Sequence, residues 1–247
     1  MRTPRALAAA VLLAAALPRA AFALNAAELK IYSPAVEYGE KEIEWRSFLS
    51  GKKSDHEQGH AMSVAYAPTS FWYAEVYEVL HKDPSLPLVA DSIEIENGFQ
   101  LSQPGSLWAD LGVLTELEIA QRQGDPNAFA LAPLLEKQIG PELFTVNLPL
   151  EWKFGPNFVP GTGFAYRARW QHLLSPYFSP AVEAFGEPGV IGRWLRADTQ
   201  THQLGPAAYG SVKWGQKQRL RYSVSSLFGL STASPDWTLV TRLEFEF

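Results

Sequence analysis

The chain closes on Trp237-Thr238-Leu239-Val240-Thr241-Arg242-Leu243-Glu244-Phe245-Glu246-Phe247, and this stretch decides the fold class. Every odd-numbered position in it is apolar, aromatic or threonine, whereas all three charged residues occupy even-numbered positions. An alternation with a period of two is that of a β-strand with two different faces. A terminal strand with one apolar face and an aromatic last residue indicates a strand that faces lipid.

The same alternation recurs along the chain in segments of about ten residues, with aromatic residues near both ends. Twelve strands are predicted, at about 41–52, 57–67, 71–82, 88–99, 107–121, 127–138, 142–154, 162–173, 179–186, 201–214, 217–229 and 236–247. Short connections such as 68–70 and 215–216 alternate with longer ones such as 187–200, as in transmembrane barrels. The expected fold is all-β, a transmembrane antiparallel up-and-down β-barrel of about 12 strands, and ten strands would also fit the pattern.

The first 23 residues have the form of a signal peptide. Arg2 and Arg5 are followed by an apolar run over 6–17, and Ala21-Phe22-Ala23 matches a cleavage site. The run is too short for a membrane helix, which needs about 20 apolar residues. We therefore divide the chain into a signal peptide (1–23), a periplasmic N-terminal lead-in (24–40) and a barrel (41–247), with Leu24 as the first mature residue.

The composition excludes several other classes of protein. The chain has no cysteine and a formal net charge of -5, with 19% charged residues. A disulfide-stapled mini-protein, a disordered tail and a basic nucleic-acid binder are all inconsistent with these values. No nucleic-acid partner is expected.

The cleavable leader, the alternating segments and the terminal Leu243-Glu244-Phe245-Glu246-Phe247 resemble those of Gram-negative outer-membrane β-barrel proteins, and in particular small porin-like transporters. The resemblance implies that the chain lies in outer-membrane lipid and that Phe247 is the signal read by the barrel-assembly machinery. It implies no cofactor and names no solute.

His56-Glu57-Gln58-Gly59-His60 matches the H-E-x-x-H pattern of zinc peptidases, in which a helix places both histidines on one face. A polar loop precedes it, and the residues that follow alternate like a strand. Residues four apart on a strand are about 13 Å apart, too far to share one zinc ion. We therefore expect an exposed first loop with two ordinary histidines and no metal site.

A barrel-type lipid hydrolase is the second enzymatic alternative. His172 follows Trp170 on the predicted outward face. Such an enzyme needs a serine within hydrogen-bond reach of the histidine, and the outward positions of the neighbouring predicted strands contain none. We expect no catalytic residues.

The predicted lumen has two walls of opposite charge. Residues 24–125 contain 7 basic and 17 acidic residues, whereas 126–247 contain 11 basic and 9 acidic residues. In a ring of twelve strands, the fourth and fifth strands lie across the lumen from the tenth and eleventh. The predicted lumen-lining charges are Glu94, Glu96, Asp110, Glu116 and Glu118 on the acidic wall, Arg167, Arg169, Lys213, Arg219 and Arg221 on the basic wall, and Arg242, Glu244 and Glu246 on the last strand.

The positions of the charged residues in the last two predicted strands indicate how these strands pair. Arg219 with Glu246, and Arg221 with Glu244, have position numbers that both sum to 465, so one antiparallel register brings both pairs together. These pairs neutralise part of the basic wall. The acidic wall should then dominate and give weak cation selectivity.

These features predict a passive channel or uptake pore for small polar solutes. Barrels of eight strands are filled by side chains and those of sixteen hold water, so a barrel of twelve can be either. A plugged structural or surface barrel, its lumen closed by interior ion pairs, remains the first alternative, and the lipid hydrolase the second.

Overall fold

The computed structural model describes residues 29–215 and 218–247. The predicted signal peptide, its cleavage before Leu24 and Gln216 of one predicted turn lie outside the described residues. Within them, no helix has the length and apolar character needed to span a membrane.

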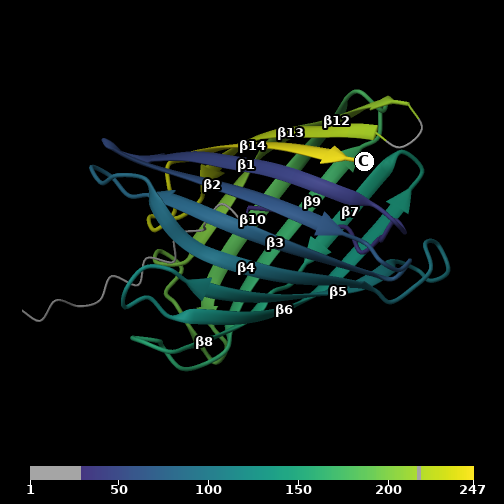
Figure 1. The fold of residues 1–247 in the computed structure, drawn as a ribbon. Helices are drawn as coiled ribbons and strands as arrows, with labels where there is room; N and C mark the ends of the chain where they lie inside the picture. Colours follow the sequence, from purple (N-terminus) through teal and green to yellow (C-terminus); the bar gives the residue numbers. More distant parts are fainter. Residues whose placement is uncertain (1–28, 216–217) are drawn as a thin grey trace, which may run out of the picture.

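The described residues form one antiparallel β-barrel (Figure 1). Its strands are β1 (Lys41–Lys52), β2 (Asp55–Tyr66), β3 (Trp72–Lys82), β4 (Val89–Gln100), β5 (Asp110–Ala120), β6 (Asn127–Ile139), β7 (Glu142–Asn147), β8 (Leu150–Phe154), β9 (Gly163–His172), β10 (Ser179–Val190), β11 (Arg193–Trp194), β12 (Thr201–Trp214), β13 (Gln218–Gly229) and β14 (Trp237–Glu246). β7 and β8 both pair with β6 and β9 and form one wall strand, while β11 pairs only with β10. The described wall therefore has twelve strands, which confirms the prediction.

The barrel closes through a seam between β1 and β14. Ten residue pairs join the two strands, from Glu42 opposite Glu246 to Gly51 opposite Trp237. Successive side chains of β1 point to opposite faces of the wall. Trp45 is 36% exposed on the outer face, whereas Glu44 is fully buried in the lumen. The wall thus presents apolar side chains outward and polar ones inward, the arrangement of a membrane-spanning barrel.

Two local features shape the wall. Pro149 divides β7 from β8 because it has no backbone N–H for the ladder, although its carbonyl still accepts a hydrogen bond of 3.0 Å from the Ala165 amide. At Gly205, β12 lies so close to β13 that a Cβ atom would come within 1.9 Å of the Ser226 carbonyl oxygen. Glycine is therefore required at this position.

Residues 29–36, called the N-terminal segment below, lie inside the barrel. Lys30 is 7% exposed and Tyr32 is 3% exposed. The sequence predicts a lead-in over 24–40, and the structure places 29–36 of this range in the lumen. The cause is a set of polar partners on the inner wall, described below, which pair with the polar groups of the segment. The segment joins β1 at the terminal end of the barrel, where β1 begins and β14 ends.

The lumen contains an apolar cluster where a water-filled pore would have polar side chains. Leu29 and Ile31 of the N-terminal segment belong to it, together with inward side chains of β1, β2, β3, β10, β13 and β14. The wall residues of this cluster are Phe48, Ala61, Tyr77, Val79, Phe185, Leu227 and Val240. Among these strands β3 and β10 are six positions apart in the ring of twelve, so the cluster extends from one side of the lumen to the other.

Candidate functional site: the barrel lumen

The inner side of the seam is a network of ion pairs. Arg219 lies 3.1 Å from Glu246, and Arg221 lies 2.9 Å from Glu244, in the register predicted from the sequence. Arg242 contacts Glu244 and reaches across the seam to within 2.9 Å of Glu44. These pairs tie β13, β14 and β1 together from within the barrel.

The acidic wall is formed by β4 and β5. Glu94 lies opposite Glu118, and Glu96 lies opposite Glu116, so all four predicted side chains share the inner face. Glu94 and Glu96 are fully buried, and Glu96 accepts a hydrogen bond of 2.6 Å from the Tyr32 hydroxyl. The N-terminal segment therefore contacts the acidic wall through Tyr32.

The ammonium group of Lys30 is held by three wall side chains. Its Nζ lies 2.9 Å from Glu44, 3.0 Å from Glu75 and 2.6 Å from the Tyr77 hydroxyl. Burial alone would lower the pKa of Lys30, but the carboxylates of Glu44 and Glu75 outweigh this effect and raise the pKa above its ordinary value. Lys30 is therefore held as a buried cation.

The main chain of the N-terminal segment is recognised as well as its side chains. Asn147 accepts a hydrogen bond of 2.7 Å from the Tyr32 amide and donates one of 2.9 Å to the Tyr32 carbonyl. The amide of Val36 donates to the Gln100 side chain at 2.8 Å, and Arg167 donates to the Lys30 carbonyl at 3.4 Å. Four barrel-to-backbone hydrogen bonds thus fix the path of the segment.

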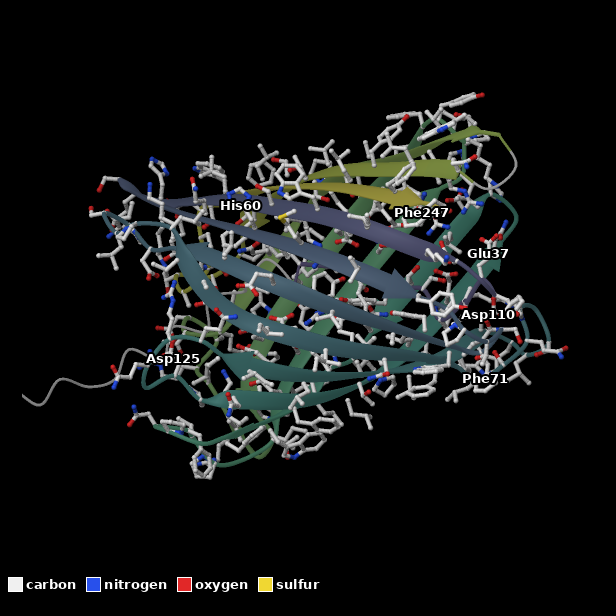
Figure 2. All side chains as sticks on the ribbon, in the orientation of Figure 1. Glu37, His60, Phe71, Asp110, Asp125 and Phe247 are labelled. Atoms are coloured by element: carbon white, nitrogen blue, oxygen red, sulfur yellow. The ribbon has the colours of Figure 1, made fainter. Side chains whose placement is uncertain are left out.

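The other predicted lumen charges lie nearer the terminal end. Arg169 lies over the ring of Tyr209, at 4.7 Å from its centroid. Lys213 is exposed at the end of β12, and Asp110 accepts a hydrogen bond of 2.6 Å from the Gly105 amide in the loop before β5. Asp110 therefore holds a loop at the rim and is not joined to the central network, while Figure 2 shows it at the same end as Glu37.

A cavity of about 520 Å³ lies between the N-terminal segment and the basic side of the barrel. Side chains of both signs line it, among them Glu40, Glu42, Arg169, Arg219 and Arg221. Burial raises the pKa of Glu40, which lies before β1, although the guanidinium of Arg221 opposes this effect at 3.6 Å. The cavity offers donors and acceptors to a small polar solute.

Sequence reasoning missed the residues that hold the N-terminal segment. Glu44, Glu75 and Asn147 are scattered over three strands, and only the closed barrel brings them to Lys30 and Tyr32. The available signal was local, since Glu44 and Glu75 are inward-facing acids on the first and third strands. It identifies lumen residues but not what they bind.

The H-E-x-x-H residues lie on β2, not in a loop, because the strand begins at Asp55. His60 stacks on Trp45 at 6.1 Å between centroids, and His56 packs against Trp237 at 5.9 Å. Both histidines therefore belong to the outer aromatic surface. Among the described residues, the groups of three or more side chains close enough to share a metal ion contain glutamates only.

His172, which the hydrolase alternative requires, is at the end of β9. Its Nδ1 lies 2.8 Å from a carboxylate oxygen of Glu142, and the other oxygen of Glu142 accepts a hydrogen bond from the Trp170 indole. The histidine thus forms part of a surface cluster with an acid and an indole. This arrangement supplies no nucleophile.

Phe247 lies at the terminal end on the outer side of the barrel (Figure 2). Its amide donates a hydrogen bond of 2.9 Å to the Lys41 carbonyl, and its ring stacks on Phe245 at 5.6 Å. The last residue therefore continues the seam ladder by one further bond. Its role as an assembly signal stays a prediction.

No protein-family model matches the sequence, and no curated protein matches it in sequence. The fold is similar to that of an outer membrane channel from Pseudomonas putida F1, with a TM-score of 0.59 and 11% identity over 86% of this chain and 97% of that one. It is also similar to the KdgM porin, solved in complex with disordered oligogalacturonate, with a TM-score of 0.53 and 9% identity over 83% of this chain and 98% of that one. The chain thus has the fold of outer-membrane β-barrel channels.

Proposed function

We propose that this protein is a passive channel for small polar solutes in the outer membrane of a Gram-negative bacterium. The observation that carries the proposal is the contrast between the two faces of the closed wall. Apolar side chains cover the outside, whereas acidic and basic side chains surround a cavity of about 520 Å³ on the inside. A purely structural barrel can fill its interior with side chains, whereas this lumen leaves space for a small solute.

In the described conformation this channel is closed. The N-terminal segment contacts Glu96 of the acidic wall, and Leu29 and Ile31 complete the apolar cluster in the lumen. An apolar constriction excludes ions because dehydrating them there is costly. Conduction therefore requires the N-terminal segment to leave its place, after which two of the nine cluster residues are gone.

Planar-bilayer recording of the purified full chain tests the proposal. We expect discrete current steps separated by long silent periods, because the closed conformation predominates. The Lys30→Met variant, which removes the buried cation of the segment, should conduct for a larger share of the time. Silent bilayers with both proteins, each shown to be folded by its heat-modifiable migration on gels, would overturn the proposal.

The same silent result would favour a plugged surface barrel. The observation in favour of this second candidate is the buried polar network that fixes the N-terminal segment, since buried ion pairs can close a lumen permanently. Export to the outer membrane is tested separately. Sequencing of the mature N-terminus from outer-membrane fractions should find Leu24, and an intact leader there would contradict the proposed cleavage.

A further inference from the structure

The N-terminal segment is bound to the barrel as a ligand is bound to a site. Four of its hydrogen bonds are made by wall side chains to its main chain, and Asn147 contacts both the amide and the carbonyl of Tyr32. Contacts to the main chain do not depend on the side chains of the bound peptide. Any extended peptide in this place can form them.

The wall also selects a side chain. Glu44, Glu75 and Tyr77 surround the ammonium group of Lys30, and all three are at least 98% buried. An ammonium ion has three N–H donors, and the three wall groups are three acceptors at 2.6 to 3.0 Å. A carboxylate in this place would meet two like charges, so the site discriminates by the sign of the charge.

Tyr32, two residues after Lys30, binds the wall through its side chain as well. Its hydroxyl donates to Glu96, and its ring packs against Leu114, Ala132 and Leu134. This subsite accepts an aromatic side chain that carries a donor. The cavity of about 520 Å³ borders the same segment, so a free peptide can approach the site from within the lumen.

We propose that the lumen contains a binding site for short extended peptides with a lysine-like side chain, which the N-terminal segment occupies as a tethered ligand. The inference deepens the proposed function, on which it rests, by naming basic oligopeptides as the class of solute. The tether raises the local concentration of the segment to the millimolar range, so that a free peptide competes poorly in the wild type.

The test uses full-length protein in detergent and a blocked peptide with the sequence of residues 29–33, Leu-Lys-Ile-Tyr-Ser. Isothermal titration should detect binding to the Lys30→Met/Tyr32→Ala variant, whose own segment is weakened, and at least tenfold weaker binding to the wild type. The Lys52→Met variant loses the same charge at an exposed loop contact and should behave like the wild type.

Two further titrations define the chemistry of the site. Replacing the lysine of the peptide by norleucine, or adding Glu75→Gln to the weakened variant, should each reduce affinity at least tenfold. Equal affinity for the lysine and norleucine peptides would overturn the assignment of an ammonium subsite. No binding to a weakened variant that remains heat-modifiable would overturn the peptide site itself.

Titration does not depend on conduction, so the two proposals can fail separately. Binding by a protein that is silent in bilayers would refute the channel and retain the peptide site. Conduction by a protein that does not bind the peptide would refute the peptide site and retain the channel.

Discussion

We expect Lys30 to hold the N-terminal segment in the lumen, and Lys30→Met tests this role most directly. The substitution removes the ammonium group and keeps an unbranched side chain of similar length, so packing changes little. It breaks the contacts to Glu44, Glu75 and Tyr77. No strand pairing involves Lys30, so the barrel itself should keep its thermal stability.

The free energy lost in Lys30→Met depends on the partners that Glu44 and Glu75 keep. Breaking a buried ion pair by removing one member costs about 3–5 kcal/mol when the other charge is left alone. Here Glu44 keeps Arg242 at 2.9 Å, and Glu75 keeps the Ser63 hydroxyl at 2.6 Å. The loss should therefore resemble that of one charged hydrogen bond, about 2–3 kcal/mol, which raises the ratio of withdrawn to seated segment roughly 30- to 150-fold.

Single-channel recording measures this ratio as the fraction of time in the open state. The open fraction should rise roughly 30- to 150-fold in Lys30→Met, with the conductance of each open channel unchanged, because the wall is the same. Lys52→Met serves as the control, since Lys52 binds only loop carbonyls at 2.5 and 3.0 Å. An open fraction within about threefold of wild type would refute the reasoning that Lys30 holds the segment.

Three further predictions concern assembly, selectivity and the wall. Deleting Phe247 or replacing it by Asp should lower the amount of heat-modifiable protein in outer-membrane fractions, and normal insertion would contradict its role as a signal. Glu116→Gln together with Glu118→Gln should lower the preference for cations in channels opened by Lys30→Met. Reversal potentials across a salt gradient measure this preference. An unchanged cation-to-anion permeability ratio would mean that the two glutamates do not line the conducting path. Gly205→Ala should destabilise the barrel by more than about 2 kcal/mol in urea unfolding, because its Cβ would meet a backbone carbonyl at 1.9 Å.

The strand pattern was predictable because lipid imposes one rule on every wall strand. Outward positions are mostly apolar, so the faces separate in the sequence, and the Arg219–Glu246 and Arg221–Glu244 register follows from charge positions alone. The boundaries were less predictable. β10 runs to Val190, beyond the predicted end at 186, because its last residues pair with β9 and with the short β11.

The occupied lumen was not predictable from the same rule. Leu29, Lys30, Ile31 and Tyr32 alternate like a short strand, but their partners lie far away in sequence, up to 137 residues for Lys30 and Arg167. The inward apolar side chains Phe48, Phe185 and Leu227 interrupt the polar inner face. In the sequence, each of these residues only weakens the polar and apolar alternation of its strand. The closed ring shows that they belong to one cluster.

The seam between β1 and β14 has a consequence for the chain before it reaches the membrane. Until Glu42 meets Glu246 and Gly51 meets Trp237, the sheet has two long edges with unpaired backbone groups and a broad apolar face. Such edges recruit other chains and lead to aggregation. Pairing the first strand with the last removes both edges at once. The yield of the protein in cells should therefore depend on how well chaperones protect the unsealed chain, and much less on how stable the finished barrel is.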